Sequence, residues 1–312
     1  MKRLLVILAV IVVAGLFLLP ACPATGGLTR EEQSRLEMVR EMKDLEKRLG
    51  FAETRNFLTY QPETQAYDYY FYTSATELPY SLDDPRLRSA SGTAANATVD
   101  RENNDVFFYS IEAVAEIGTP VTRSLIRAPL ARFIRVVFHE DWHEQIALPL
   151  GIEEPTGEVV SYAAATLFAL EKFGADSAVY RTLAGEFGGR LAESRVYGDT
   201  CARLEALYAE YDAGRLSRPE TLRRKAELLR ELAGGLRGIW GAAPEQLNNA
   251  YLGFQMTYLR HMPAVYAAYA AQGGDLARTV ALFRQMPGQG EPFPTLADVK
   301  ALEQQALAYL RQ

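Results

Sequence analysis

The stretch that decides the fold is residues 129–147, which read PLARFIRVVFHEDWHEQIA. Apolar residues occupy most positions around this segment, so it predicts a helix that is buried on nearly every side. The same helix carries His139, Glu140 and His143. Polar side chains inside such a helix are costly unless they have partners, and a bound metal ion would supply one.

Residues 139–143 match the pattern H-E-x-x-H, and two of the three histidines of the chain fall within it. Positions i and i+4 of a helix lie one turn apart on one face. His139 and His143 can therefore bind one Zn²⁺ at the usual bond length of about 2.0–2.1 Å. Glu140 follows the first histidine and is predicted to be the general base that activates water. The alternative is a pair of histidines that lie by chance beside a carboxylate.

A zinc site of this kind needs a third protein ligand. Pro149 is expected to end the first helix, and residues 151–157 to connect it to a second, apolar helix that begins at Glu158. A carboxylate in the first turn of that helix can point back toward the histidines, so Glu158 is the predicted third ligand. In the alternative interpretation Glu158 only complements the helix dipole. Glu153 and Glu154 are competing candidates, placed in the loop beside Pro155.

A hydrolytic site also needs a hydrogen-bond donor for the negative charge that develops in the transition state. Tyr258, His261 and Tyr251 lie together on one late helical segment. Tyr258 and His261 are the candidates for this role, although each of the three residues can equally have a structural one.

The N-terminus has the features of an export signal. Lys2 and Arg3 precede an apolar run over residues 4–19, which is followed by Leu-Pro-Ala-Cys at residues 19–22. This ending resembles a bacterial lipobox, so residues 1–21 are predicted to be a lipoprotein signal peptide and Cys22 the lipidated residue. Residues 22–28 would then be a tether to the membrane, and the protein would lie in the cell envelope, periplasmic or on the outer surface. A transmembrane anchor, or a cleaved signal with an incidental cysteine, is the alternative.

Residues 29–312 are expected to form one domain that is mainly α with a small N-terminal β element (α+β). A capping box at residues 29–32 begins a helix that runs to Gly50. The aromatic segments 67–73 and 106–111 predict strands within a β-containing part at about 51–115, separated by the polar stretch 82–104. The body from about 129 to 312 reads as helical, and Pro263 is expected to kink or split its segment.

Composition narrows the class of partner. The chain has 312 residues, of which 48% are hydrophobic, and its net charge is −6. This acidic balance gives no support to nucleic-acid binding. If Cys22 is lipidated, Cys201 has no partner and is expected to be a buried thiol.

Three stretches carry a family resemblance: residues 35–43 followed by Leu-Gly at 49–50; residues 138–145; and Leu-Asn-Asn-Ala at 247–250 with Thr-Tyr at 257–258 and residues 273–276. Through them the chain resembles the predicted aminopeptidases of bacteria, a gluzincin-like group that is often lipid-anchored. The resemblance implies a zincin-like helical core, zinc and peptide hydrolysis. It assigns His139, His143 and Glu140 directly and also carries Glu158. Asp141 and Trp142 depart from the smaller, apolar pair that is expected between Glu140 and His143.

The resulting hypothesis is a membrane-anchored zinc peptidase, of aminopeptidase type, that acts on peptide substrates. A second hypothesis is a non-catalytic surface lipoprotein that binds a partner and keeps a structural zinc site. A third is a metallohydrolase that acts on an amide other than a peptide.

Overall fold

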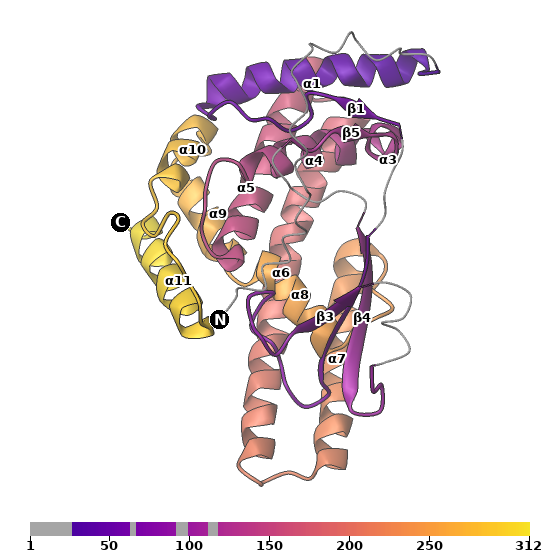
Figure 1. The fold of residues 1–312 in the computed structure, drawn as a ribbon, viewed down its shortest axis with the longest axis vertical. Helices are drawn as coiled ribbons and strands as arrows, with labels where there is room; N and C mark the ends of the chain where they lie inside the picture. Colours follow the sequence, from indigo (N-terminus) through magenta and orange to yellow (C-terminus); the bar gives the residue numbers. More distant parts are fainter. Residues whose placement is uncertain (1–26, 63–66, 92–98, 112–117) are drawn as a thin grey trace, which may run out of the picture.

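The computed structural model describes residues 27–62, 67–91, 99–111 and 118–312. The molecule is mostly helical, with a few short strands on one side (Figure 1), which confirms the predicted fold class. None of the described helices is long and apolar enough to span a membrane. The predicted signal peptide, Cys22 and most of the tether lie outside the described residues.

Helix α1 (Arg30–Leu49) begins and ends where the sequence predicts. The Thr29 hydroxyl accepts the Glu32 N–H, and the Glu32 carboxylate accepts the Thr29 N–H, which completes the capping box. The helix ends at Gly50, whose φ of 86° is the left-handed conformation that favours glycine. The buried side of α1 packs on the helix that carries the histidines, α4 (Leu130–Trp142), and on α10 (Leu276–Arg284).

The β element is a three-stranded sheet in the order β3-β2-β4. Strands β2 (Tyr67–Ser74) and β4 (Asn104–Ile111) pair antiparallel, as their aromatic pattern predicts. Strand β3 (Arg88–Ser91) lies within the stretch expected to be a polar connection, and that expectation was wrong for these four residues. Its polar side chains are compatible with a strand because β3 is at an edge, where one face and one side meet solvent.

The remaining elements are helices, apart from a two-residue parallel pair between β1 (Tyr60–Gln61) and β5 (Val121–Thr122). They are α3 (Arg123–Arg127), α5 (Leu150–Phe173), α6 (Ala178–Asp212), α7 (Arg218–Trp240), α8 (Asn249–Leu259), α9 (Met262–Ala271) and α11 (Leu296–Leu310). Helix α5 is central: it contacts α4, α6, α8, α9, α10 and α11. The long helices α6 and α7 form a hairpin that projects from this body, at the bottom of Figure 1.

The start of α5 differs from the expectation. The helix begins at Leu150, eight residues before Glu158, and Pro155 lies inside it. A proline removes one helical hydrogen bond and costs about 3 kcal/mol in a helix interior. Here it is only the sixth residue of the helix, and burial of side chains such as Ile152 and Val159 offsets that cost. Glu153 and Glu154 therefore lie on a helix and not in a loop.

Two other expectations for the helical body are confirmed. The late helical segment divides into α8 and α9 at residues 260–261, and Pro263 lies in the first turn of α9, where its missing N–H costs little. Cys201 is buried in α6, and burial raises the pKa of its thiol to about 12. A thiol with that pKa is unreactive at neutral pH.

The Asn-Asn pair at 248–249 has a structural role. The side chain of Asn248 caps α8 at the Tyr251 N–H and donates to the Val106 carbonyl of β4. Asn249 is fully buried; its amide donates to the carbonyls of Ala75 and Glu77, and its side-chain oxygen accepts the Tyr208 hydroxyl. These bonds attach the segment that follows β2 to α8 and α6.

We expect Asn249→Ala to lower the free energy of unfolding by about 2–4 kcal/mol, because it leaves several buried polar groups without partners. Denaturant titration measures the change. Gln304→Ala, at an exposed position of α11, is the control and should change the value by less than about 0.5 kcal/mol. Equal stability of the two variants would contradict the role given to Asn249.

Candidate metal centre

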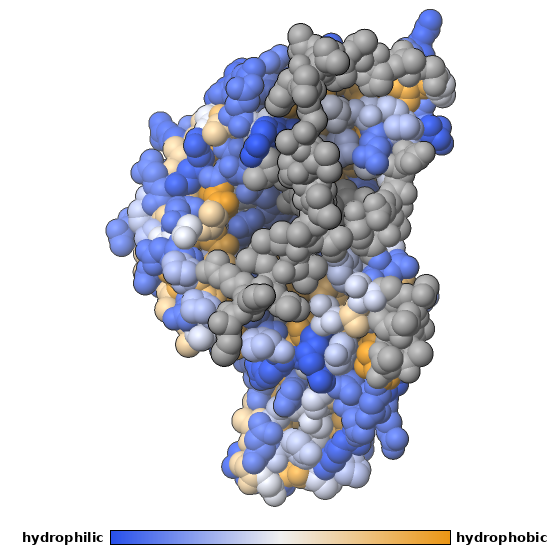
Figure 2. Space-filling model, viewed as in Figure 1, coloured by the Kyte–Doolittle hydropathy of each residue, from blue (hydrophilic) through white to orange (hydrophobic). Residues whose placement is uncertain are grey.

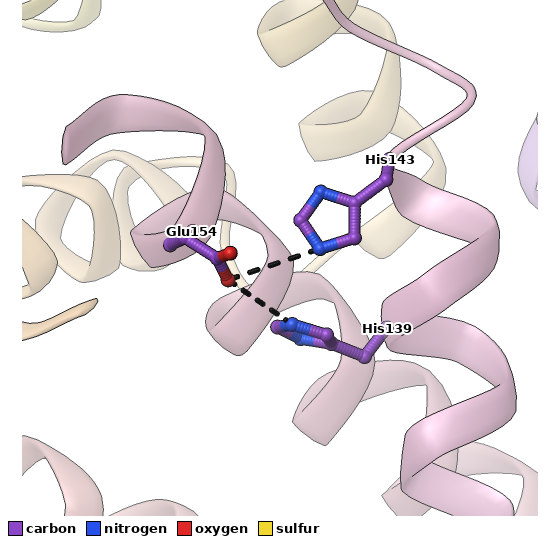
Figure 3. Close-up of side chains that lie close together, drawn as sticks. All are labelled: His139, His143 and Glu154. Atoms are coloured by element: carbon purple, nitrogen blue, oxygen red, sulfur yellow. Dashed lines mark hydrogen bonds and ion pairs between the residues drawn. The ribbon is translucent and has the colours of Figure 1, made fainter. Parts of the chain in front are cut away.

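The two histidines of the H-E-x-x-H motif face the second turn of α5. The Glu154 carboxylate lies between them (Figure 3): one oxygen is 3.2 Å from His139 Nε2 and 3.8 Å from His143 Nε2. One ligand atom from each of these residues lies within 4.8 Å of the other two. Two imidazole nitrogens and a carboxylate oxygen are a donor set that suits zinc, so these three residues can hold a metal ion.

A carboxylate also lies beside Nδ1 of each imidazole, the ring nitrogen that does not face Glu154. His143 Nδ1 is 2.6 Å from Glu153, and His139 Nδ1 is 3.9 Å from Glu158. His139 Nδ1 is buried and has no hydrogen-bond partner among the described residues. Carboxylates in this position fix the tautomer and orientation of metal-binding histidines and raise their basicity. Glu153 and Glu158 of α5 thus lie beside the Nδ1 atoms, and the Nε2 atoms of both histidines face Glu154.

Glu158 does not lie between the histidines, where the sequence hypothesis put it. Its carboxylate pairs with Arg190 at 2.7 Å and with Arg135 at 3.4 Å. Burial alone would raise its pKa, but Arg190 and Arg135 outweigh burial and lower the pKa of Glu158 to about 2. As a metal ligand this carboxylate would have to give up two guanidinium partners. Glu154 carries no such pair, and it is the carboxylate that the structure brings to both Nε2 atoms.

The electrostatics of the site favour a bound cation. Although burial lowers the pKa of His143, Glu154 and Glu153 raise it to about 10. Burial raises the pKa of Glu154, but the nearby His143 and His139 lower it by more than burial raises it. The pKa is therefore below its ordinary value, and this carboxylate is ionised. When no metal is bound, the positive charge of protonated His143 compensates the negative charge of these carboxylates. Metal binding would replace that proton with a larger positive charge.

Glu140 lies next to these ligands on α4. Burial raises the pKa of its carboxyl group, and the nearby His139 and His143 oppose that effect. A carboxylate with a raised pKa accepts a proton more readily at neutral pH, as a general base requires. The amide of Asn56 donates to the Glu140 carbonyl and fixes this turn of α4.

Tyr258 and His261, the predicted donors, lie in different surroundings. Tyr258 is near the metal centre: burial raises its pKa well above the ordinary value, and the charges of Glu154 and Glu158 raise it further. His261 Nε2 is instead 3.1 Å from Glu303 and 3.2 Å from the Tyr80 hydroxyl. Tyr251, the third residue of that segment, accepts the Tyr197 hydroxyl and packs its ring against Phe107.

Sequence reasoning preferred Glu158 as the third ligand and gave Glu154 only as a competing candidate. It did not anticipate Glu153 behind His143, or the two arginines at 135 and 190 that hold Glu158. A signal for Glu153 and Glu154 was present. Pro149 followed by acidic residues within a turn is typical of a helix N-terminus, and a helix that begins there carries Glu154 on its second turn. Arg190 gave no local signal, because it lies on α6, far from the motif in sequence. Arg135 lies on α4 itself, but nothing in the sequence indicates that it contacts Glu158.

The comparisons with known proteins identify a family. A family model described as "putative aminopeptidase" matches residues 88–291, which is well over half of the chain and includes α4, α5 and α8. The chain belongs to this aminopeptidase family. No curated protein and no solved structure matches it.

We expect Glu154→Gln to weaken binding of Zn²⁺ more than about 100-fold, because it removes a ligand. Glu158→Gln should weaken it only about tenfold, the effect of a residue behind a ligand. Calorimetric titration of the metal-free protein measures both values. Glu144→Gln is the control, since this carboxylate faces the Arg55 and Asn56 N–H groups instead. Loss of binding in Glu158→Gln with retention in Glu154→Gln would make Glu158 the ligand.

Proposed function

We propose that the protein is a zinc-dependent peptidase of aminopeptidase type, in which His139, His143 and Glu154 hold the metal. The observation that carries this proposal is the convergence of those three donors beside Glu140 on a helix with the H-E-x-x-H pattern. Membership of an aminopeptidase family supports the same reaction class.

A bound zinc ion would polarise the scissile carbonyl group and increase the acidity of the attacking water. Glu140 accepts the proton from that water and then gives it to the leaving amine, which its raised pKa favours. Glu153 and Glu158 keep the two imidazoles in the orientation that the metal requires. Arg135 and Arg190 keep Glu158 in place and ionised.

Tyr258 is the better candidate for the donor that stabilises the developing oxyanion. Its phenol is protonated at neutral pH, because burial and the nearby carboxylates raise its pKa. A protonated phenol can donate a hydrogen bond to negative charge on the substrate. His261 is less suited, since its Nε2 faces Glu303.

The second hypothesis, a partner-binding protein with a structural zinc site, receives less support. Structural zinc sites are generally closed by four protein ligands. Only three donors converge within the described part of the chain, which would leave a position for water or substrate. A library that contains both peptides and other amides distinguishes a peptidase from a hydrolase of a different amide.

The experiment that tests the proposal is Glu140→Gln. We expect this variant to retain one zinc ion per chain and to lose activity on a mixed peptide library by at least about 100-fold, because the general base is removed. Metal content by mass spectrometry and initial cleavage rates measure the two effects. Zinc bound by the wild type without cleavage of any peptide would favour the second hypothesis.

We also propose that the protein is anchored to the membrane of the cell envelope through lipid on Cys22. Support comes from the residues alone: a charged start, an apolar run and a small residue before the cysteine. With a net charge of −6 the protein has little electrostatic attraction to anionic lipid. Attachment would therefore depend on acyl chains, of which more than one is needed for a stable hold.

Cys22→Ser should move the protein from the detergent phase to the aqueous phase when cells that express it are extracted with a phase-separating detergent. The reason is that serine cannot carry the thioether-linked lipid. Cys201→Ser, which changes the buried thiol, is the control and should leave partitioning unchanged. If Cys22→Ser stays in the detergent phase, the segment before it anchors the protein.

A further inference from the structure

Helix α1 and the segment that follows it enclose a cavity of about 520 Å³, lined by side chains of α1 and of residues 51–60. Sites for small molecules have volumes of about 300–1,000 Å³, so this cavity is large enough for one. Both lining segments precede residue 88, and the cavity therefore lies outside the segment that the family model matches.

A polar cluster lies at this cavity and comprises Lys43, Glu46, Thr54 and Asp141. The Lys43 ammonium group donates to the Asp141 carboxylate and to the Thr54 hydroxyl. Thr54 also donates to Asp141, at 2.8 Å. Lys43, Glu46 and Thr54 line the cavity, whereas Asp141 belongs to α4. One ammonium group therefore serves two carboxyl groups.

Glu46 is the carboxyl group that this ammonium group serves less well. Its Oε2 is 3.7 Å from Lys43 Nζ, which is beyond hydrogen-bond distance. Its Oε1 is buried and has no hydrogen-bond partner among the residues that the structure describes, and the whole side chain is only 3% exposed. Burial and the charge of Asp141 raise the pKa of Glu46 to about 10, and Lys43 opposes only part of that increase. At neutral pH Glu46 therefore holds a proton, which it can share with Asp141, and a bound cation would replace that proton.

Aromatic rings form another part of the lining. Phe51, Phe57 and Tyr60 all belong to it, and Lys43 Nζ lies 5.9 Å from the centre of the Phe57 ring. The faces of aromatic rings attract cations. Phe57 has a φ of 61°, the left-handed conformation that is unfavourable for a bulky residue, and its N–H donates to the Thr119 carbonyl. Such a conformation persists only where the surrounding structure imposes it, so the fold holds this ring in place.

We propose that this cavity binds a small organic amine in its protonated form, with the ammonium group at Glu46 and the hydrocarbon body against the aromatic rings. An ammonium group supplies both the positive charge that the polar cluster lacks and an N–H donor for Glu46 Oε1. The exposed charges of the lining balance, so the excess of acid lies at the polar cluster: the exposed side chains are Arg40, Lys47, Asp44 and Glu53.

A metal ion is a less suitable ligand for this cavity than an amine. The described residues contain one group of three potential metal ligands, and Glu46 is not part of it. Aromatic rings offer a metal ion no ligand atoms, whereas they contact the hydrocarbon body of an amine favourably. None of the three residues of the metal centre lines the cavity, so this inference does not depend on the proposed peptidase function.

The test compares benzylamine with benzyl alcohol, which has a similar shape and no charge. Calorimetric titration of the full-length, zinc-loaded protein at pH 7 measures both affinities. Glu46→Gln keeps the size of the side chain and removes the carboxyl group, and Leu36→Trp fills the cavity from a half-buried position of its lining. Glu37→Gln, at an exposed position of α1, is the matched control. Glu154→Gln, which removes a metal ligand, reveals any binding of the amine to zinc.

We expect benzylamine to bind at least about tenfold more tightly than benzyl alcohol, because it adds hydrogen bonds between charged groups. Glu46→Gln should remove this preference, and Leu36→Trp should abolish binding of both compounds. Glu37→Gln and Glu154→Gln should leave both affinities unchanged. Equal affinities in the wild type, or a preference that survives Glu46→Gln, would overturn the proposal. Loss of benzylamine binding in Glu154→Gln would also overturn it, since the amine would then bind at the zinc ion.

Discussion

Helices α4 and α5 lie close together at Gly157, and the geometry of the metal centre depends on that approach. A side chain at this position would lie 3.2 Å from the His139 ring and 3.3 Å from Trp142. With glycine there, the indole of Trp142 reaches the Thr156 hydroxyl at 2.9 Å. This contact fixes the position of α5 along the axis of α4. It therefore brings Glu153, Glu154 and Glu158 opposite the two histidines.

Charge balance then determines what each carboxylate can do. Glu158 is neutralised by two arginines, whereas Glu154 has only histidines beside it. In a buried site an unpaired carboxylate is costly and a paired one is held firmly. Glu158, which has guanidinium partners, is therefore suited to orient a metal-binding histidine. Glu154, which has no guanidinium partner, is suited to bind a cation.

The face of the molecule drawn in Figure 2 is mostly hydrophilic, with only small separate apolar patches outside the grey atoms.

The sequence predicted the parts of this centre that a single helix encodes. His139, Glu140 and His143 are recognisable because helical spacing alone puts the two histidines on one face, and α1 is recognisable from its capping box. The third ligand depends on where the next helix starts. Pro155 was interpreted as a sign of a loop, but burial of the first turns of α5 offsets the missing hydrogen bond. Contacts between distant segments, such as Arg190 with Glu158, leave no local pattern. Strand β3 was missed for a similar reason, since its pairing with β2 and not its composition makes it a strand.

Asp141 and Trp142, which depart from the small apolar pair expected within the motif, connect α4 to the elements packed around it. Asp141 is fully buried and forms an ion pair with Lys43 of α1, and it accepts the Thr54 hydroxyl. Trp142 packs its ring against Phe51 and Phe283. Because Asp141 and Trp142 stand between Glu140 and His143, α1 and α10 contact α4 within the same turn that faces α5. Fixing α4 from both sides limits its rotation, and rotation is the movement that would separate His139 and His143 from Glu154.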